Sequence, residues 1–183
     1  MFPQISTQRL TLRNLVLDDS ETMFEYRSHP DVCRYQFWEP ETLQEVQLFI
    51  EKNSTAEFNA SGWYQIAIVR QEDNLLIGDC AVHILESEPR VAELAITISP
   101  AAQSKGYACE SLVALIDCLF HKFDKHRVFA SVDPLNVASM ALMRRIGLRM
   151  EAHFVQSLWF KDRWADDVVF AILKAEWQTR LAN

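Results

Sequence analysis

The sequence predicts a single α/β domain over residues 1–183, in which a mixed, mostly antiparallel sheet is flanked by helices. A strand at 91–98, a helix at 104–123 and a strand at 127–132 form a β-α-β unit, which makes two strands of the sheet parallel. The length of 183 residues is that of one domain, and a composition of 49% hydrophobic and 23% charged residues is typical of a globular chain. No linker or internal repeat divides the chain.

The first third of the chain predicts one strand and two helices. Residues 9–13 alternate polar and apolar side chains, as a strand does. The next polar run has capping-box chemistry, in which Asp18 accepts from first-turn N–H groups and Glu21 reaches back, so we expect a helix to about residue 26. Pro40 suits the first position of a second helix, whose apolar side chains follow at helical spacing: Leu43, Val46 and Ile50.

The central third supplies a hairpin and the β-α-β unit. Strands at 63–69 and 76–84 flank a turn at Asn74 and predict an antiparallel hairpin. Strand 91–98 presents its even-numbered residues on one face and ends at Pro100. The helix at 104–123 has apolar residues every three or four positions: Ala108, Leu112, Leu115, Leu119 and Phe123.

The last third predicts a helix and a second hairpin. The helix begins near Asn136 and ends at Gly147, the residue type that favours a left-handed C-terminal position. Residues 148–159 and 164–173 have the apolar and β-branched content of two further strands.

Composition restricts the partners of this chain. The net charge of −7 and the pI near 5.2 disfavour binding to nucleic acid and favour cationic ligands, amines among them. No apolar run approaches the ~20 residues that span a bilayer, and the start has no signal-peptide pattern, so we expect a cytoplasmic protein without a membrane partner. The cysteines show no metal-binding spacing, so we expect no metal and reduced thiols at four positions: Cys33, Cys80, Cys109 and Cys118.

The segment with the strongest chemical signal joins strand 91–98 to the following helix. It reads Gln103-Ser104-Lys105-Gly106-Tyr107-Ala108. A glycine at a helix entrance lets the backbone approach a ligand, and the free N–H groups with the helix dipole favour an anion such as a pyrophosphate. The same glycine could serve only the turn. The segment matches neither GxxxxGK[ST] nor GxGxxG, which excludes a Walker loop and a dinucleotide fingerprint.

Gln-x-x-Gly-x-Ala after a strand that ends in proline resembles the acetyl-CoA pyrophosphate signature of the GNAT N-acetyltransferase superfamily. The run from Ala92 to Glu110 is similar to its ribosomal-protein N-terminal acetyltransferase (Rim-type) branch. Further matches, in chain order, are Ile77-Gly78, Asn136-Val137-Ala138-Ser139, Gly147-Leu148, Asp166 and Glu176-Trp177.

The resemblance implies a GNAT domain whose two parallel strands splay apart, with acetyl-CoA as co-substrate in the resulting cleft. The pantetheine arm would run along Ile96, Thr97 and Ile98. The pyrophosphate would bind the loop from Gln103 through Ser104, Lys105, Gly106 and Tyr107 to Ala108. Asn136 would reach the pantetheine arm, although asparagine is also a good helix N-cap.

The transfer needs a base, because an alkylammonium ion must lose a proton before it attacks a thioester. Glu93 is the first candidate, directly or through water, and His83 on the neighbouring strand is the second. Many members of the superfamily protonate the leaving thiolate with a tyrosine, but Met143 stands at that position here. In the Rim-type branch the corresponding hydroxyl is that of Ser139, which could equally bond only to the helix end.

The acceptor is a primary amine, either a protein N-terminus or a small amine, bound by the segments 35–39 and 159–164 according to the resemblance. Lys161-Asp162 replaces the glycine that the branch often has at the hairpin turn, so the resemblance does not determine the shape of the acceptor groove. The loss of the tyrosine at Met143 leaves a non-catalytic acyl-CoA sensor as an alternative. Two further alternatives are a transferase for a longer acyl group and an α/β domain whose match to the signature is accidental. The sequence allows either a monomer or a homodimer.

Overall fold

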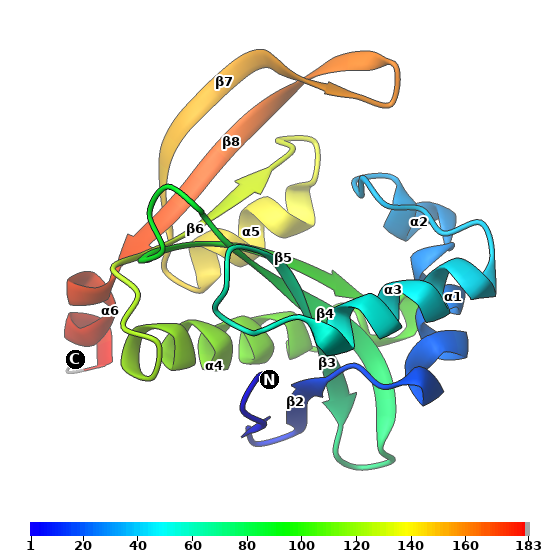
Figure 1. The fold of residues 1–183 in the computed structure, drawn as a ribbon. Coiled ribbons are helices and arrows are strands. Elements are labelled where there is room, and N and C mark those ends of the chain that lie inside the picture. The colour runs from blue at the N-terminus through cyan, green and yellow to red at the C-terminus, as the bar shows by residue number, and fades with distance from the viewer. Residues whose placement is uncertain (182–183) are drawn as a thin grey trace.

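Eight strands form one sheet in the order β1-β2-β3-β4-β5-β6-β8-β7 in the computed structural model, which describes residues 1–181 (Figure 1). The strands are β1 (Ile5–Ser6), β2 (Leu10–Asn14), β3 (Gly62–Arg70), β4 (Leu75–Ile84), β5 (Val91–Ile98), β6 (Arg127–Val132), β7 (Arg149–Phe160) and β8 (Arg163–Leu173). The helices are α1 (Ser20–Arg27), α2 (Pro30–Cys33), α3 (Leu43–Thr55), α4 (Tyr107–His121), α5 (Val137–Arg145) and α6 (Lys174–Leu181), with 3-10 turns at Leu17–Asp19 and Pro100–Ala102.

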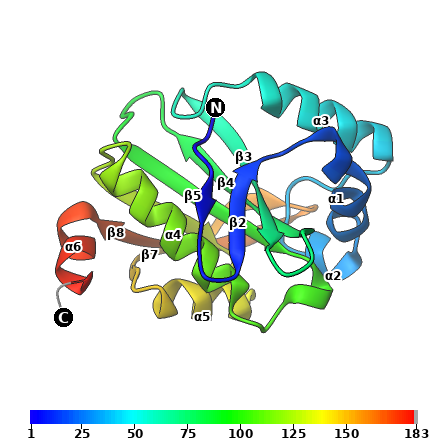
Figure 2. The same cartoon turned by 90° about the horizontal axis from the view of Figure 1, so that it is seen from below.

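The two faces of the sheet carry different helices. Even-numbered side chains of β5 and β6 enter a core shared with α4, whose residues Leu112, Leu115 and Leu119 are fully buried. On the opposite face, Ala67 and Val69 of β3 pack against α1 and α3 in a second, smaller core. Figure 2 shows α4 lying across the strands, and α1 and α3 packed beside each other away from it.

The parallel pair β5–β6 stays together for only three residue pairs, Val91–Arg127, Ala92–Val128 and Glu93–Phe129. Beyond Glu93 the two strands diverge, and each leads into a helix N-terminus, α4 after β5 and α5 after β6. The expected α/β fold with one splayed parallel pair in a mostly antiparallel sheet is therefore confirmed.

Three predicted helix starts were wrong. Helix α4 begins at Tyr107 rather than at residue 104, because Ser104 and Gly106 have positive φ. Asp18 and Glu21 form no capping box, because a 3-10 turn precedes α1 and Asp19 instead accepts from the backbone N–H of Val16 and from Arg13. Helix α3 begins at Leu43 rather than Pro40, since the hydroxyl of Thr42 caps it. The short elements β1, α2 and α6 were not predicted. No helix within residues 1–181 is long and apolar enough to cross a membrane.

Candidate active site

The divergence of β5 and β6 opens the sheet at the carboxyl ends of two parallel strands, which is where ligands bind in open α/β sheets. On its other edge, β5 stays paired to β4 along the segment predicted for the pantetheine arm, with Ile96, Thr97 and Ile98 opposite Cys80, Asp79 and Gly78. Gly78 is required here, because a Cβ at this position would collide with the carbonyl oxygen of Thr97. The ladder with β4 therefore fixes the position of β5, whose other edge faces the opening.

The loop between β5 and α4 places the glycine of the sequence motif at the helix entrance. Gly106 adopts φ 82° and is the N-cap of α4, and Ser104 has φ 61°, so two left-handed residues turn the chain into the helix. Ser104, Lys105 and Gly106 are exposed, whereas Tyr107 is buried. The first N–H groups of α4 have no acceptor within the helix and are available to an anion. The side chain of Gln103 donates to the carbonyl of Ile98 (3.0 Å) and thereby ties the loop to the end of β5.

At the start of α5, Asn136 is the N-cap, and its side-chain oxygen accepts from the backbone N–H of Ser139 (3.1 Å). This bond uses the amide oxygen of Asn136 and the backbone of Ser139. It leaves the Asn136 NH₂ group and the Ser139 hydroxyl, both on half-buried residues, to a ligand. Met143 is buried in the main core and presents no polar group to the opening.

Glu93 lies at the apex of the opening, on the face of the sheet opposite α4. Its Oε2 is 3.3 Å from Nδ1 of His83, the residue directly across the β4–β5 ladder. Trp63 stacks on the His83 ring with centroids 4.8 Å apart and planes 11° apart, because the β3–β4 register places them opposite each other. The side chains of His83 and Glu93 are 28% and 21% exposed, so the pair is partly shielded yet reachable.

Three loops are joined in a closed ring near the end of β6, and we call them the loop ring: residues 33–39, residues 133–135 and the β7–β8 turn at 160–163. Lys161 donates to the carbonyl of Cys33 (2.8 Å) and pairs with Glu39. Tyr35 donates to the carbonyl of Leu135 (3.0 Å), and Arg163 contacts Asp133 (3.2 Å). Figure 1 shows the β7–β8 hairpin arching away from the sheet, with its turn on the side of α2.

The β7–β8 turn itself keeps a tight geometry without glycine. Lys161 and Asp162 have φ 48° and 60°, the two positive values of a type I′ hairpin turn. The ring of Phe160 meets Phe37 edge to face at 4.9 Å. The turn is therefore still a two-residue turn although it contains no glycine. The 33–39 segment packs against it.

The site residues come together in part. The structure places Glu93 beside His83, and it places the 103–108 loop and Asn136 with Ser139 at the two helix starts that flank the opening. Trp63 was not predicted as a site residue, although the hairpin register places it beside His83. The side chain of Glu110 is bonded to the β1–β2 turn.

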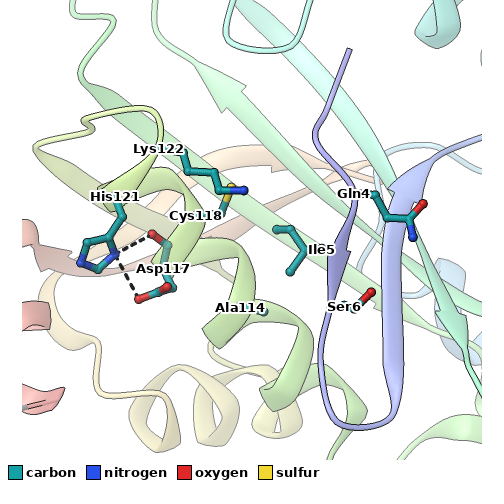
Figure 3. Close-up of a pocket in the computed structure, with 8 residues that line it drawn as sticks. All are labelled: Gln4, Ile5, Ser6, Ala114, Asp117, Cys118, His121 and Lys122. Atoms are coloured by element: carbon teal, nitrogen blue, oxygen red, sulfur yellow. Dashed lines mark hydrogen bonds and ion pairs between the residues drawn. The ribbon is translucent and has the colours of Figure 1, made fainter.

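A separate hollow of about 300 Å³ lies between β1 and α4, away from these residues (Figure 3). In its lining, Nδ1 of His121 lies 2.9 Å from the carbonyl oxygen and 3.1 Å from the carboxylate of Asp117, within the same helix. Burial raises the pKa of the Cys118 thiol, which lines the same hollow and is therefore a poor nucleophile at neutral pH. We assign no reaction to it.

Comparison with known proteins identifies the class. The model of the acetyltransferase (GNAT) domain family matches residues 9–149, and the chain belongs to this family. It is accordingly an acetyl-CoA-dependent N-acetyltransferase. The N-acetyltransferase YnaD of Bacillus subtilis, itself uncharacterised, is 29% identical over 94% of this chain and 98% of its own length. The spermidine N(1)-acetyltransferase of Vibrio cholerae is 25% identical over 94% and 97%.

Solved structures agree in fold over nearly the whole chain. A GNAT-family acetyltransferase from Bacillus anthracis superposes with a TM-score of 0.87 at 28% identity, covering 95% of this chain and all of the other. A candidate ribosomal-protein-serine acetyltransferase from Vibrio cholerae superposes with a TM-score of 0.79 at 27% identity, covering 93% and 97%.

Proposed function

We propose that this chain acetylates a small primary amine in a ternary complex with acetyl-CoA, and that Glu93 removes the proton from the amine. The observation that carries the proposal is the position of the Glu93–His83 pair at the apex of the β5–β6 opening, on the face opposite α4. Acetyl-CoA would lie along Ile96 to Ile98 with its phosphates on the 103–108 loop, at the start of α4. Glu93 is on the face of the sheet opposite α4, so it would meet an amine that enters from that face.

The chemistry follows in one displacement. The acceptor ammonium ion first gives a proton to the Glu93 carboxylate, directly or through a water molecule. The neutral nitrogen then attacks the thioester carbonyl carbon, and its second proton passes to solvent as the amide forms. Backbone N–H groups of β5 near Ile96 stabilise the negative oxygen. When the tetrahedral intermediate collapses, the C–S bond breaks and the Ser139 hydroxyl protonates the thiolate. Ser139 then recovers a proton from solvent, and no covalent enzyme intermediate forms.

The loop ring favours a slender acceptor over a folded protein terminus. Ion pairs and hydrogen bonds from Lys161, Tyr35 and Arg163 tie the three loops to one another, so widening the ring requires breaking them. Exposed aromatic side chains in the segments 35–39 and 159–164, namely Phe37, Trp159 and Trp164, suit an alkylammonium ion by cation–π attraction. The resemblance to a spermidine acetyltransferase supports the same acceptor class.

A protein N-terminal amine is the second candidate, and it corresponds to the Rim-type branch. Its support is the likeness to the candidate ribosomal-protein-serine acetyltransferase. In that case the three loops would have to part to admit a peptide.

The deciding experiment measures CoA release with a thiol reagent in the presence of acetyl-CoA and one of three acceptors: spermidine, a simple alkylamine, or a peptide with a free N-terminal serine. We expect turnover with the small amines and at least tenfold slower turnover with the peptide. Faster turnover with the peptide would establish the second candidate. Binding of acetyl-CoA without turnover of any amine in a broad panel would refute the catalytic proposal and indicate an acyl-CoA sensor.

A further inference from the structure

The β1–β2 turn is fastened to the first turn of α4 through one carboxylate. Glu110 Oε1 accepts from the Thr7 hydroxyl (2.6 Å) and from the backbone N–H of Arg9 (2.8 Å), and its Oε2 accepts from Nε of Arg9 (2.7 Å). The Glu110 side chain is 16% exposed and that of Arg9 is 43% exposed, so the pair is partly shielded from water. Three donors on one carboxylate make this a fixed contact rather than a passing surface ion pair.

Arg9 also contacts the loop that precedes α4. Its Nη1 donates to the carbonyl of Lys105 (3.0 Å), and its guanidinium lies 4.5 Å above the ring centroid of Tyr107. A Cβ added to Gly106 would come within 3.4 Å of Nη2. One side chain therefore contacts the loop on both sides of Gly106.

The bond to Lys105 sets the direction of the next N–H group. In a trans peptide the C=O and the N–H point to opposite sides. Because the Lys105 carbonyl is turned toward Arg9, the Gly106 N–H is turned away from it, out of the contact with the β1–β2 turn. If the Lys105–Gly106 peptide flipped, a carbonyl oxygen would point where a phosphate oxygen is expected.

The charge of Glu110 makes Arg9 necessary in a second way. Glu110 lies one helical turn after Gly106, so its negative charge would repel a phosphate bound at the helix start. Burial would raise the pKa of Glu110, but hydrogen bonds from Thr7 and Arg9 outweigh it and lower the pKa, so the carboxylate is ionised at neutral pH. The guanidinium of Arg9 cancels this charge at contact distance.

We propose that Arg9 is a positioning residue for acetyl-CoA, which orients the Lys105–Gly106 peptide and neutralises Glu110 so that the loop accepts phosphates. This inference rests on the proposed use of the 103–108 loop by acetyl-CoA. Arg9 acts through the loop and needs no contact with the reacting atoms.

The test compares Arg9→Gln, Glu110→Gln and the double variant by calorimetric titration with CoA. Arg9→Gln exposes the loop to an unpaired carboxylate, so we expect the Kd for CoA to rise at least tenfold while kcat at saturating acetyl-CoA stays within twofold. The double variant loses the repulsion as well, so its Kd should recover by threefold or more relative to Arg9→Gln. A purely structural contact would lower Tm in all three variants without this recovery.

Two further variants separate charge from geometry. Arg9→Lys keeps the charge but not the forked reach to both Lys105 and Glu110, so its Kd should fall between those of the wild-type protein and Arg9→Gln. Arg90→Gln removes the same charge from an exposed pair with Glu88 and should leave the Kd unchanged. A folded Arg9→Gln variant with wild-type affinity overturns the inference alone. A wild-type chain that does not bind CoA overturns the proposed function and the inference with it.

Discussion

Glu93 and His83 face each other across β5 and β4, with Oε2 of the carboxylate 3.3 Å from Nδ1 of the imidazole, at the last residue of β5 that still pairs with β6. The pair therefore lies at the point where the sheet opens, where Glu93 is the proposed base. Trp63, stacked on the other side of His83, limits the orientations of the imidazole ring.

Replacing Glu93 with Gln should lower kcat/KM for the amine by about 10²-fold or more, the usual contribution of a positioned base. Without the carboxylate, attack depends on the small fraction of amine already deprotonated in solution. The loss should therefore be greatest at the acid end of the pH profile and shrink as pH rises toward the pKa of the amine. His83→Gln serves as the comparison. An unaltered profile in Glu93→Gln would make Glu93 structural and leave His83 as the candidate base.

Replacing Gly106 with Val should weaken acetyl-CoA binding at least tenfold. A β-branched residue is strained at φ 82°, and its side chain would press on Arg9. Gly62→Val is the matched control, since Gly62 also has a positive φ of 107° but open space around its Cβ position. Both variants should lose stability, by about 1–3 kcal/mol. Only Gly106→Val should lose affinity in a titration, and equal affinities would remove the loop from the binding site.

Ser139→Ala and Asn136→Ala separate catalysis from helix capping. The cap bond joins the Asn136 side chain to the backbone of Ser139, so Ser139→Ala keeps it whereas Asn136→Ala loses about 1 kcal/mol of stability. If Ser139 is the acid, Ser139→Ala should lower kcat by roughly tenfold, because a thiolate is already an able leaving group, with Tm and acetyl-CoA affinity unchanged. Normal turnover would mean that another group or water protonates the thiolate.

Asp79 should be the most sensitive buried position on the α1–α3 side of the sheet. Its fully buried carboxylate accepts from Tyr26 (2.6 Å), from Gln65 and from Arg27, which forms a buried ion pair with it. Asp79→Asn leaves the guanidinium of Arg27 without a counter-charge and should cost about 3–5 kcal/mol in urea unfolding. Replacing both partners, Arg27→Met with Asp79→Leu, should cost much less. An equal loss in both variants would show that shape rather than charge balance decides.

The regular elements were predictable because each depends on local periodicity. The bounds of β5 and β6 agree with the predicted strands, and α5 begins after Asn136 and ends before Gly147, which has φ 88°. Helix starts were less predictable, because several residues near each start can cap it. Asp18 and Pro40 had the right chemistry, but Asp19 with Arg13 and Thr42 with Glu45 formed the actual contacts.

The site was predictable only where one segment contains it. The 103–108 loop is continuous in sequence, so a local motif was enough to propose it as a binding segment. The contacts of Arg9 with Glu110 and of Tyr35 with Leu135 join residues about 100 positions apart, and no local pattern indicates such pairs. The loop ring depends on the paths of three separate loops and on contacts between them, which no local pattern predicts.

Lys161→Met tests whether the loop ring selects the acceptor. The change keeps the aliphatic stem but removes the bonds to Cys33 and Glu39, so the hairpin turn should separate from the 33–39 segment. We expect KM for a slender amine to rise several-fold, relative activity toward peptide N-termini to increase, and the Kd for acetyl-CoA to stay constant. Lys174→Met removes a similar charge from a pair with Asp124, on α6, and should change none of these values. If Lys161→Met retains the wild-type ratio of amine to peptide turnover, the loop ring does not set specificity, and selection must occur nearer to Glu93.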